Sequence, residues 1–428
     1  MKRNDTSREP NIPTVRLDSS SRRRLDTASC RQNKQARGAA GTLALMAGCA
    51  CLLGAGQAAA EPLSAPSFSG PLRPNPDPMT TDVGVFGKLH ITGQLTGLGQ
   101  ALSNGIPGSD PRTTNPLLDI GNAQIEIQTT GAPLTFFVQA GAYSLPALGS
   151  AYMRATDVTD QLYGPVPVAY AKLELSPNVS VQAGLLPTLI GAESTFTFQN
   201  MNIARGLLWN QEPAISRGIQ VNYSDGPFSA SVSLNDGFYS EKYNWVSGLV
   251  SYAATPSSTI TLVAAGNLSD TDKTGAATPL AQNNSSIFNV IYTYTDGPLT
   301  LQPYLQYTTV RQNREIGIDR SAETFGGALL ARYAINENFS IAGRVEYIAS
   351  SGGDCRAQAD CAPTNLLYGP KSRAWSLTVT PTYQRGVFFT RTELSYTRID
   401  RVSEGFAFGS DFDKRDQARG MIEAGVLF

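Results

Sequence analysis

Apolar and polar residues alternate along most of the chain from Val83 to its end. In the first such run, one face carries Val83, Val85, Leu89, Ile91 and Leu95, and the other carries Lys88, His90, Thr92 and Gln94. A period of two residues is the pattern of a β-strand that separates an apolar from a polar environment. The same alternation returns at residues 301–308 and 339–347. The chain is therefore predicted to consist mainly of β-strands.

Turn signals divide this region into many strands. Short segments rich in Gly, Pro, Asn and Asp occur at residues 130–133, 176–178, 225–227, 255–257, 296–298, 335–338 and 385–386. They alternate with longer polar connections at roughly 96–117, 144–164, 187–214, 236–242, 269–284, 311–320, 350–371 and 400–416. These seven turns and eight connections join sixteen strands. Most of these strands reach the ~9–11 residues that a tilted transmembrane strand needs.

Short turns at one end and long loops at the other are typical of bacterial outer-membrane barrels, which have an even number of strands. We therefore predict that residues 83–428 form an all-β, antiparallel transmembrane barrel of sixteen strands, with short periplasmic turns and long extracellular loops. A soluble β-propeller would need a motif repeated in each blade. The sequence shows no such repeat.

The alternation also predicts which charged residues face the lumen. An Arg or Lys on the lipid face costs ~2–4 kcal/mol near the middle of the membrane, so charges should gather inside. The predicted lumen wall carries Lys88, His90, Glu126, Lys172, Glu174, Arg332, Arg344, Glu346, Arg391, Glu393, Arg419 and Glu423. This set has mixed sign, so it does not indicate a strongly selective ion channel. Each charge could equally belong to a network that braces the wall.

The final strand ends in Phe428. Gly420, Ile422, Ala424, Val426 and Phe428 share one face, which predicts that Arg419 and Glu423 point into the lumen. A terminal Phe in register with an amphipathic strand resembles the assembly signal of outer-membrane barrels. Such a last strand can pair with the first and remove the open edges of the sheet.

The first 82 residues have a different character. Residues 1–60 contain ten Lys/Arg and four Asp/Glu, whereas the remainder contains 24 and 31. An apolar run from Ala39 to Gly56 and the triplet 58–60 follow the basic residues, as in a cleaved secretory signal. Residues 61–82 contain six prolines and are predicted to form an extended periplasmic segment that takes no part in a core.

The longest connection, residues 187–214, follows the fifth strand and is the third long loop. In general porins the third long loop folds inward and narrows the pore. By this analogy Glu193, Arg205, Glu212 and Arg217 are the candidate constriction residues. The alternative is an extracellular loop that packs against the rim.

Other candidate sites have simpler interpretations. Cys355 and Cys361 are the two cysteines beyond the leader, and in an exported chain they predict a disulfide. Asp411, Asp413 and Asp416 suggest either a cation site or solvated loop charge. Catalysis by an activated Ser would need a base, and the single histidine, His90, lies on the lumen face. We therefore expect no enzyme activity, no metal and no cofactor.

Residues 183–191, 203–206, 215–223 and 233–237 resemble the putative β-barrel porin-2, OmpL-like family. The resemblance extends over most of residues 83–428 and implies a bacterial outer-membrane porin. We expect passive diffusion of small hydrophilic solutes. The expected partners are outer-membrane lipid and lipopolysaccharide, the barrel-assembly machinery and, by analogy, a homotrimer, with no nucleic acid. The alternative is a structural or surface-interaction barrel with a plugged lumen and loops that bind envelope components.

Overall fold

The computed structural model describes residues 70–106, 115–352, 367–402 and 404–428. Cys355 and Cys361, for which a disulfide is predicted, lie outside these residues. The strands are β1 Met79–Asp82, β2 Lys88–Leu102, β3 Leu117–Thr130, β4 Leu134–Tyr143, β5 Val168–Ser176, β6 Val179–Pro187, β7 Ile215–Asp225, β8 Phe228–Asn235, β9 Trp245–Thr255, β10 Ser258–Asn267, β11 Ser285–Asp296, β12 Leu299–Val310, β13 Ala322–Ala334, β14 Phe339–Ser350, β15 Arg373–Arg385, β16 Phe388–Arg401 and β17 Asp416–Leu427.

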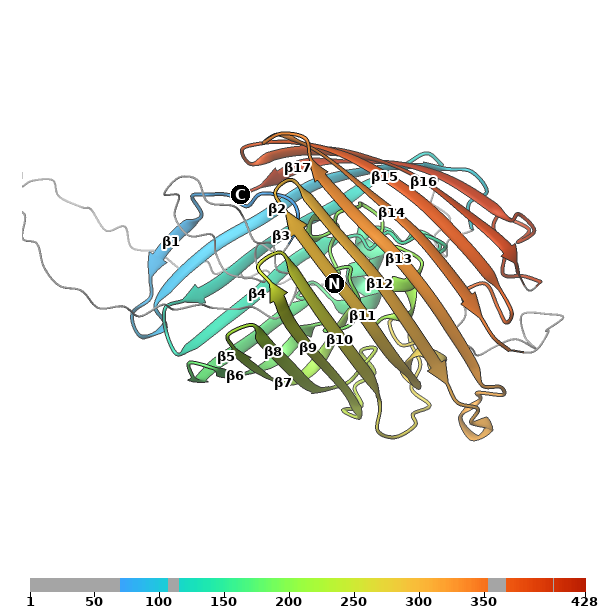
Figure 1. Ribbon diagram of the computed structural model, residues 1–428, viewed down its shortest axis with the longest axis horizontal. Helices are drawn as coiled ribbons and strands as arrows, with labels where there is room; N and C mark the ends of the chain where they lie inside the picture. Colours follow the sequence, from blue (N-terminus) through green and yellow to red (C-terminus); the bar gives the residue numbers. More distant parts are fainter. Residues whose placement is uncertain (1–69, 107–114, 353–366, 403) are drawn as a thin grey trace, which may run out of the picture. The chain divides into compact units, whose positions relative to one another are not determined.

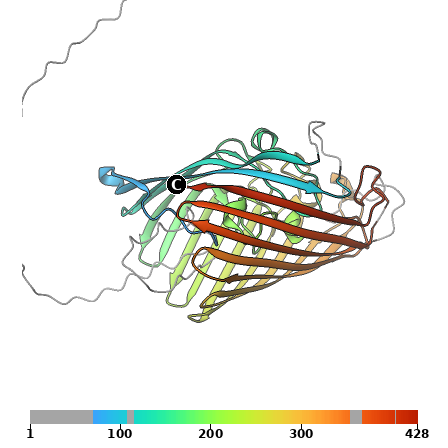
Figure 2. The ribbon, with the colours of Figure 1, turned by 90° about the horizontal axis from the view of Figure 1, so that it is seen from above.

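Strands β2 to β17 form a closed antiparallel barrel of sixteen strands (Figures 1 and 2). Each strand pairs with its neighbours in sequence, and β17 closes the ring by pairing with β2 from Arg419↔Leu102 to Leu427↔Gln94. Closure leaves no unpaired strand edge along this seam. The predicted fold class and strand number are confirmed.

The two ends of the barrel differ as the turn signals predict. Seven tight turns join β3–β4, β5–β6, β7–β8, β9–β10, β11–β12, β13–β14 and β15–β16. All seven coincide with the predicted turn segments. We call this the short-turn end and the other the long-loop end.

One predicted boundary is wrong because of glycine. The sequence suggested a loop from residue 96, but β2 continues to Leu102. Gly97 and Gly99 look like turn residues, yet both lie in regular strand pairing, opposite Ile120 and Leu118 of β3. A register shift between Thr96 and Gly97 accommodates the change of pairing.

The start of the barrel also differs from prediction. The first barrel strand begins at Lys88, whereas residues 84–86 form a 3-10 turn, η1. Gly84 and Gly87 both have positive φ, and a Cβ at Gly87 would lie 2.1 Å from the Thr130 carbonyl oxygen. The extra strand β1 pairs with residues 88–91 of β2, beyond the point where β17 ends.

The alternating faces are arranged as the pattern predicts. Ile125, Leu175, Val232 and Leu377 are exposed on the outer surface, as suits contact with lipid. Aromatic residues near strand ends typically face the lipid interface of such barrels, but Phe389 does not. It is 4% exposed and shares the inward-facing parity of Arg391 on β16.

Short helical turns occur in the connections. They are α1 Ala155–Val158, η2 Thr159–Tyr163, η3 Thr197–Gln199, η4 Leu208–Gln211, α2 Leu280–Asn283 and η5 Arg314–Ile316. The described residues contain no helix that is long and apolar enough to cross a membrane.

Candidate functional site

The connection between β6 and β7, residues 188–214, folds into the barrel, and we call it the lumen segment. The Ile203 N–H donates to Glu393 of β16 at 2.5 Å, and the Leu207 N–H donates to Glu346 of β14 at 3.1 Å. The Asn202 amide donates to Thr380 of β15 at 2.7 Å. Hydrogen bonds to three different strands hold the segment against the inner wall rather than at the rim.

Arg344 of β14 connects the wall to the lumen segment. Its guanidinium lies 2.5 Å from Glu193 and donates to the Ala204 carbonyl oxygen at 2.9 Å. Glu193 also accepts the Gly206 N–H at 2.7 Å. Both charged side chains are almost completely buried. Further hydrogen bonds help to offset the cost of burying an ion pair, and here the Ala204 carbonyl oxygen and the Gly206 N–H supply two of them.

A second ion pair fixes the beginning of the segment. Arg391 of β16 donates from Nε and Nη2 to Glu423 of β17, at 2.9 and 2.6 Å. Its guanidinium also donates to the carbonyl oxygens of Thr197 at 2.6 Å and Asn200 at 2.9 Å. One arginine therefore crosslinks two strands and the lumen segment.

The end of the segment is held by hydrogen bonds from two side chains of β12. Tyr304 of β12 donates its hydroxyl to Glu212, and Gln306 donates to the Leu208 carbonyl oxygen at 3.1 Å. Burial raises the pKa of Glu212 well above its usual range, although the Tyr304 hydrogen bond opposes this shift.

Arg205 is held in a different way from the other arginines. Its backbone pairs with the connection between β4 and β5, through the Pro146 carbonyl oxygen at 3.0 Å and the Leu148 N–H at 2.9 Å. Its buried guanidinium lies 4.7 Å above the Trp209 ring. Within the described part of the chain, this guanidinium has no hydrogen-bond acceptor.

The structure does not bring Arg217 to this cluster. Arg217 has the outward-facing parity of Ile219 and Val221 on β7, both of which are exposed. Its guanidinium pairs with Asp236 at 3.0 Å and lies 3.7 Å above the Tyr239 ring, in the connection between β8 and β9. The prediction placed Arg217 at the constriction, just beyond the loop, but β7 begins at Ile215 and its parity directs Arg217 outward.

The charged residues predicted to face the lumen fall into two groups by how deeply their side chains are buried. Seven are nearly buried: Glu126, Arg344, Glu346, Arg391, Glu393, Arg419 and Glu423. The others, Lys88, His90, Lys172, Glu174 and Arg332, have inward parity near the short-turn end. Lys172 pairs with Glu174 at 2.6 Å, and His90 lies 2.9 Å from the Thr130 hydroxyl.

The inner wall therefore has two chemically different sides. We call Arg344, Glu346, Arg391, Glu393, Arg419 and Glu423, on β14, β16 and β17, the charged wall. The inward-facing positions of β6, β7 and β8 include Ser180, Gln182, Ser216, Gln220, Asn222, Ser229, Ser231, Ser233 and Asn235, which we call the polar wall. The lumen segment is bonded to the charged wall.

Leu72 and Arg73, near the start of the described residues, also contact the barrel. Leu72 packs in a buried cluster with Phe196 and Phe198 of the lumen segment and with Phe389. The Arg73 N–H donates to the Gln384 amide oxygen at 2.8 Å, and the Gln384 amide returns a bond of 2.8 Å to the Arg73 carbonyl oxygen. The expectation that the Pro-rich stretch takes no part in a core is wrong for Leu72.

Comparison with protein families identifies the chain. The model of the family described as "Putative beta-barrel porin-2, OmpL-like" matches residues 88–428. The chain belongs to this family. It is thus an outer-membrane β-barrel of the porin type. No curated protein matches the sequence.

Solved structures agree on the fold. Outer-membrane expressed OmpT of Vibrio cholerae has a TM-score of 0.53 and 11% identity, covering 82% of this chain and 100% of its own. Salmonella typhi OmpF, solved with daunomycin, has a TM-score of 0.51 and 12% identity, with coverage of 82% and 100%. The DcaP channel of Acinetobacter baumannii gives 0.50 and 10%, with coverage of 79% and 97%.

Two features of this porin were missed from the sequence. The serines at 229, 231 and 233 alternate strictly with apolar residues, which could have indicated an uncharged stretch of wall. The entry of Leu72 had no comparable signal, because a single leucine among prolines is common in extended segments.

Asp413, a candidate cation ligand, pairs with Lys414 at 2.9 Å. No group of three His, Cys, Asp or Glu in the described residues could hold a metal ion.

Proposed function

We propose that this barrel is a porin for passive diffusion of small hydrophilic solutes, with the lumen segment as its constriction. The observation that carries the proposal is the hydrogen-bonded placement of residues 188–214 inside a sixteen-stranded barrel. A barrel of about eight strands is filled by its own side chains, whereas 16–18 strands leave an aqueous channel. The segment then reduces the width of that channel.

The proposed constriction residues are Glu193, Arg205 and Glu212. Glu193 is already paired with Arg344, so its role is to hold the segment. Glu212 accepts the Tyr304 hydroxyl, so its role is also to hold the segment. Mixed charges that pair with one another leave no strong ring of one sign, which supports weak ion selectivity.

A second candidate function is a structural barrel with a closed lumen. It is favoured by the burial of the charged wall, where Glu393 and Glu423 are both 0% exposed, and by the packing of Leu72 against the lumen segment. In that case the long loops would serve to bind envelope components.

Conductance in a planar bilayer distinguishes the two functions. The porin should give stable open steps in salt solution when folded protein, verified by heat-modifiable migration in detergent gels, is added. Correctly folded protein that never conducts would overturn the porin proposal and support the closed barrel.

The remaining expectations belong to the same proposal. Residues 1–60 would be a cleaved export signal, residues 61–82 would lie on the periplasmic side, and residues 83–428 would form the barrel. Phe428, whose N–H and carbonyl oxygen both pair with Gly93, would be read by the barrel-assembly machinery. Cys355 and Cys361 would form a disulfide, and the mature barrel would contact lipid and lipopolysaccharide and assemble as a homotrimer. Conversion of small solutes by an enzyme site is no part of this function.

A further inference from the structure

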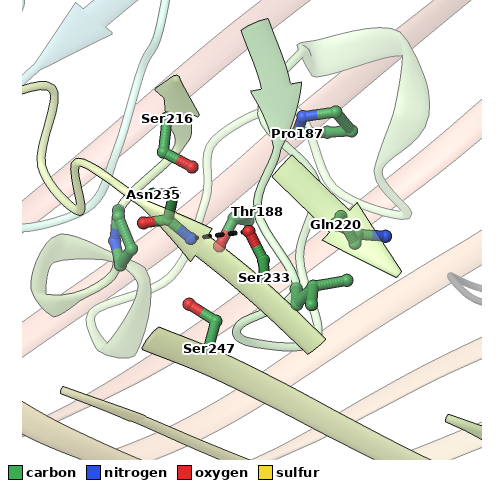
Figure 3. A pocket seen from close by; sticks show the side chains of 9 residues that line it. Pro187, Thr188, Ser216, Gln220, Ser233, Asn235 and Ser247 are labelled. Atoms are coloured by element: carbon green, nitrogen blue, oxygen red, sulfur yellow. Dashed lines mark hydrogen bonds between the residues drawn. The ribbon is translucent and has the colours of Figure 1, made fainter. Parts of the chain in front are cut away.

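The recess between the polar wall and the two ends of the lumen segment is filled almost completely by its own lining. Figure 3 shows Ser216, Gln220, Ser233, Asn235 and Ser247 around it, with the Asn235 amide donating to the Ser233 hydroxyl at 2.8 Å. The space that remains holds about one water molecule. This recess therefore has no room for a solute, whereas charged side chains at the outer rim of the barrel are exposed.

Two arginines lie opposite each other on the outer face of β15 and β16, at the long-loop end. Arg373 begins β15, and its register partner on the neighbouring strand β16 (Figure 1) is Arg401. Both side chains are exposed, and neither makes a hydrogen bond or ion pair within the described part of the chain. Like charges directly opposite each other destabilise a strand pair. No contact among the described residues offsets this repulsion.

A bulge in β16 creates the arginine pair. Between the register pairs Ala374↔Ile399 and Arg373↔Arg401, β15 advances by one residue and β16 by two. A continuous register would place Asp400 opposite Arg373, and opposite charges in that position stabilise a strand pair. Bulges are common at the rims of barrels, where they redirect side chains. Here the bulge puts a second arginine, rather than an acid, opposite Arg373.

The neighbouring charges on β16 and β17 face one another. Arg398, on the outer face of β16, lies 3.7 Å from Asp400, and both side chains are about half exposed. Asp416 of β17 is the register partner of Arg398. The two acids therefore lie beside Arg398, and the positive charge of Arg373 and Arg401 remains uncompensated.

The arginine pair lies at the depth of the lipid head groups on the extracellular side. Along the outer face of β15, Tyr383 lies toward the short-turn end and Trp375 toward the long-loop end, with the exposed Leu377 between them. Trp375 packs against Tyr396 of β16, with ring centroids 5.5 Å apart. Aromatic residues form girdles at both membrane interfaces of such barrels, and the long loops are extracellular. Arg373 follows Trp375 on the same face and so lies just beyond the outer girdle.

We propose that Arg373 and Arg401 form a binding site for the phosphate groups of lipopolysaccharide, with Arg398 at its edge. Arginine suits this ligand because its planar guanidinium can bind two phosphate oxygens at once. A phosphate held between the two guanidiniums replaces their repulsion with two attractions, and the acyl chains of the lipid would lie along the apolar surface below Trp375. The inference goes beyond the proposed function, because it concerns the outer surface and holds whether or not the lumen conducts.

Binding of purified lipopolysaccharide to the full-length folded protein in non-ionic detergent, measured by native mass spectrometry, tests the site. The double variant Arg373→Gln with Arg401→Gln should bind about tenfold more weakly, because it loses two charge-assisted contacts. The matched control Arg385→Gln removes an exposed arginine from the same face of β15 at the short-turn end and should bind as wild type does. Unchanged affinity in the double variant, or an equal loss in the control, would overturn the site.

The chemistry of the ligand is tested with three further probes. Lipopolysaccharide stripped of its lipid phosphates should bind wild type as weakly as the intact lipid binds the double variant; equal binding of both lipids would assign the contact to acyl chains instead. Binding should persist in EDTA, since loss of binding there would indicate a divalent cation bridge through Asp400 and Asp416. Inorganic phosphate that saturates the site as tightly as the lipid does would show that a free anion is the ligand.

Thermal unfolding separates a binding role from a structural one. Without lipid, the double Gln variant should be at least as stable as wild type, because it removes the repulsion between two like charges. Lipopolysaccharide should raise the unfolding temperature of wild type but not of this variant, since a ligand stabilises only the protein that binds it. Arg373→Lys with Arg401→Lys keeps both charges without the planar fork and should bind with intermediate affinity. A lower unfolding temperature of the Gln variant without lipid would show that the arginines serve the fold instead.

Discussion

The charged wall and the polar wall belong to the same barrel but differ in what their side chains bind. On the charged wall, Arg344 and Arg391 each bond to a carboxylate and to carbonyl oxygens of the lumen segment. On the polar wall, side chains such as Ser231 and Asn222 bond mainly to one another. The charged wall therefore positions the segment, whereas the side chains of the polar wall satisfy one another.

This difference has an energetic basis. A buried guanidinium loses its hydration, and the segment supplies Arg344 and Arg391 with acceptors through its backbone carbonyl oxygens. Serine and amide side chains need few partners and satisfy each other along a strand. One wall thus requires the segment for its stability, whereas the other does not.

The largest expected effect comes from Arg391→Ala. It leaves Glu423 without its guanidinium and removes the bonds to Thr197 and Asn200. Breaking a buried pair in this way typically costs about 3–5 kcal/mol, and here the cost should appear as release of the segment. Single-channel recordings should show larger and noisier currents than wild type. Wild-type currents from folded Arg391→Ala protein would contradict the role of the charged wall.

Next in size is the contrast between Glu193→Gln and Glu212→Gln. Glu193 faces Arg344 at 2.5 Å, so losing its charge should weaken the segment by about 2–4 kcal/mol. Glu212 accepts the Tyr304 hydroxyl, a bond that an amide oxygen can also accept, so Glu212→Gln should change stability by no more than about 1 kcal/mol. Limited proteolysis of residues 188–214 measures both. Equal sensitivity of the two variants would refute the distinction.

The same pair makes a prediction about pH. Because the pKa of Glu212 is raised in the folded protein, its contribution to stability is present at low pH and is lost as the pH rises through that raised value. Wild-type segments should become more accessible to proteases as the pH rises above the ordinary pKa range of a carboxyl group, and Glu212→Gln should remove this dependence. An identical pH profile in both proteins would show that Glu212 is charged throughout.

A smaller effect is expected at the N-terminal contact. Gln384→Ala removes both bonds to the backbone of Arg73, each worth about 1 kcal/mol. Residues 70–78 should then be cleaved more readily by added protease, while the barrel keeps its heat-modifiable migration. Gln302→Ala is a control on another strand, and cleavage at the same rate in both variants would argue against the contact.

The smallest effect belongs to the polar wall. Ser231→Ala removes one hydroxyl from a row of mutually bonded groups and should change stability by no more than about 0.5 kcal/mol. Thermal unfolding followed by circular dichroism measures it. A loss of stability as large as that of Arg391→Ala would show that the two walls contribute equally to the stability of the barrel.

The sequence by itself determined the barrel. Period-two alternation in a strand has only two faces, and Gly, Pro, Asn and Asp mark where each strand must turn, so strand number and lipid-facing parity followed from local rules. Only the tertiary structure decided where the connections go. No local pattern predicts the path of the loop that carries Glu193 and Glu212. Their partners, Arg344 and Tyr304, lie about a hundred residues or more away along the chain. Arg217 was misplaced although the parity of β7, a local pattern, directs it outward. Leu72 was misplaced because its position depends on contacts between distant segments, which no local pattern encodes.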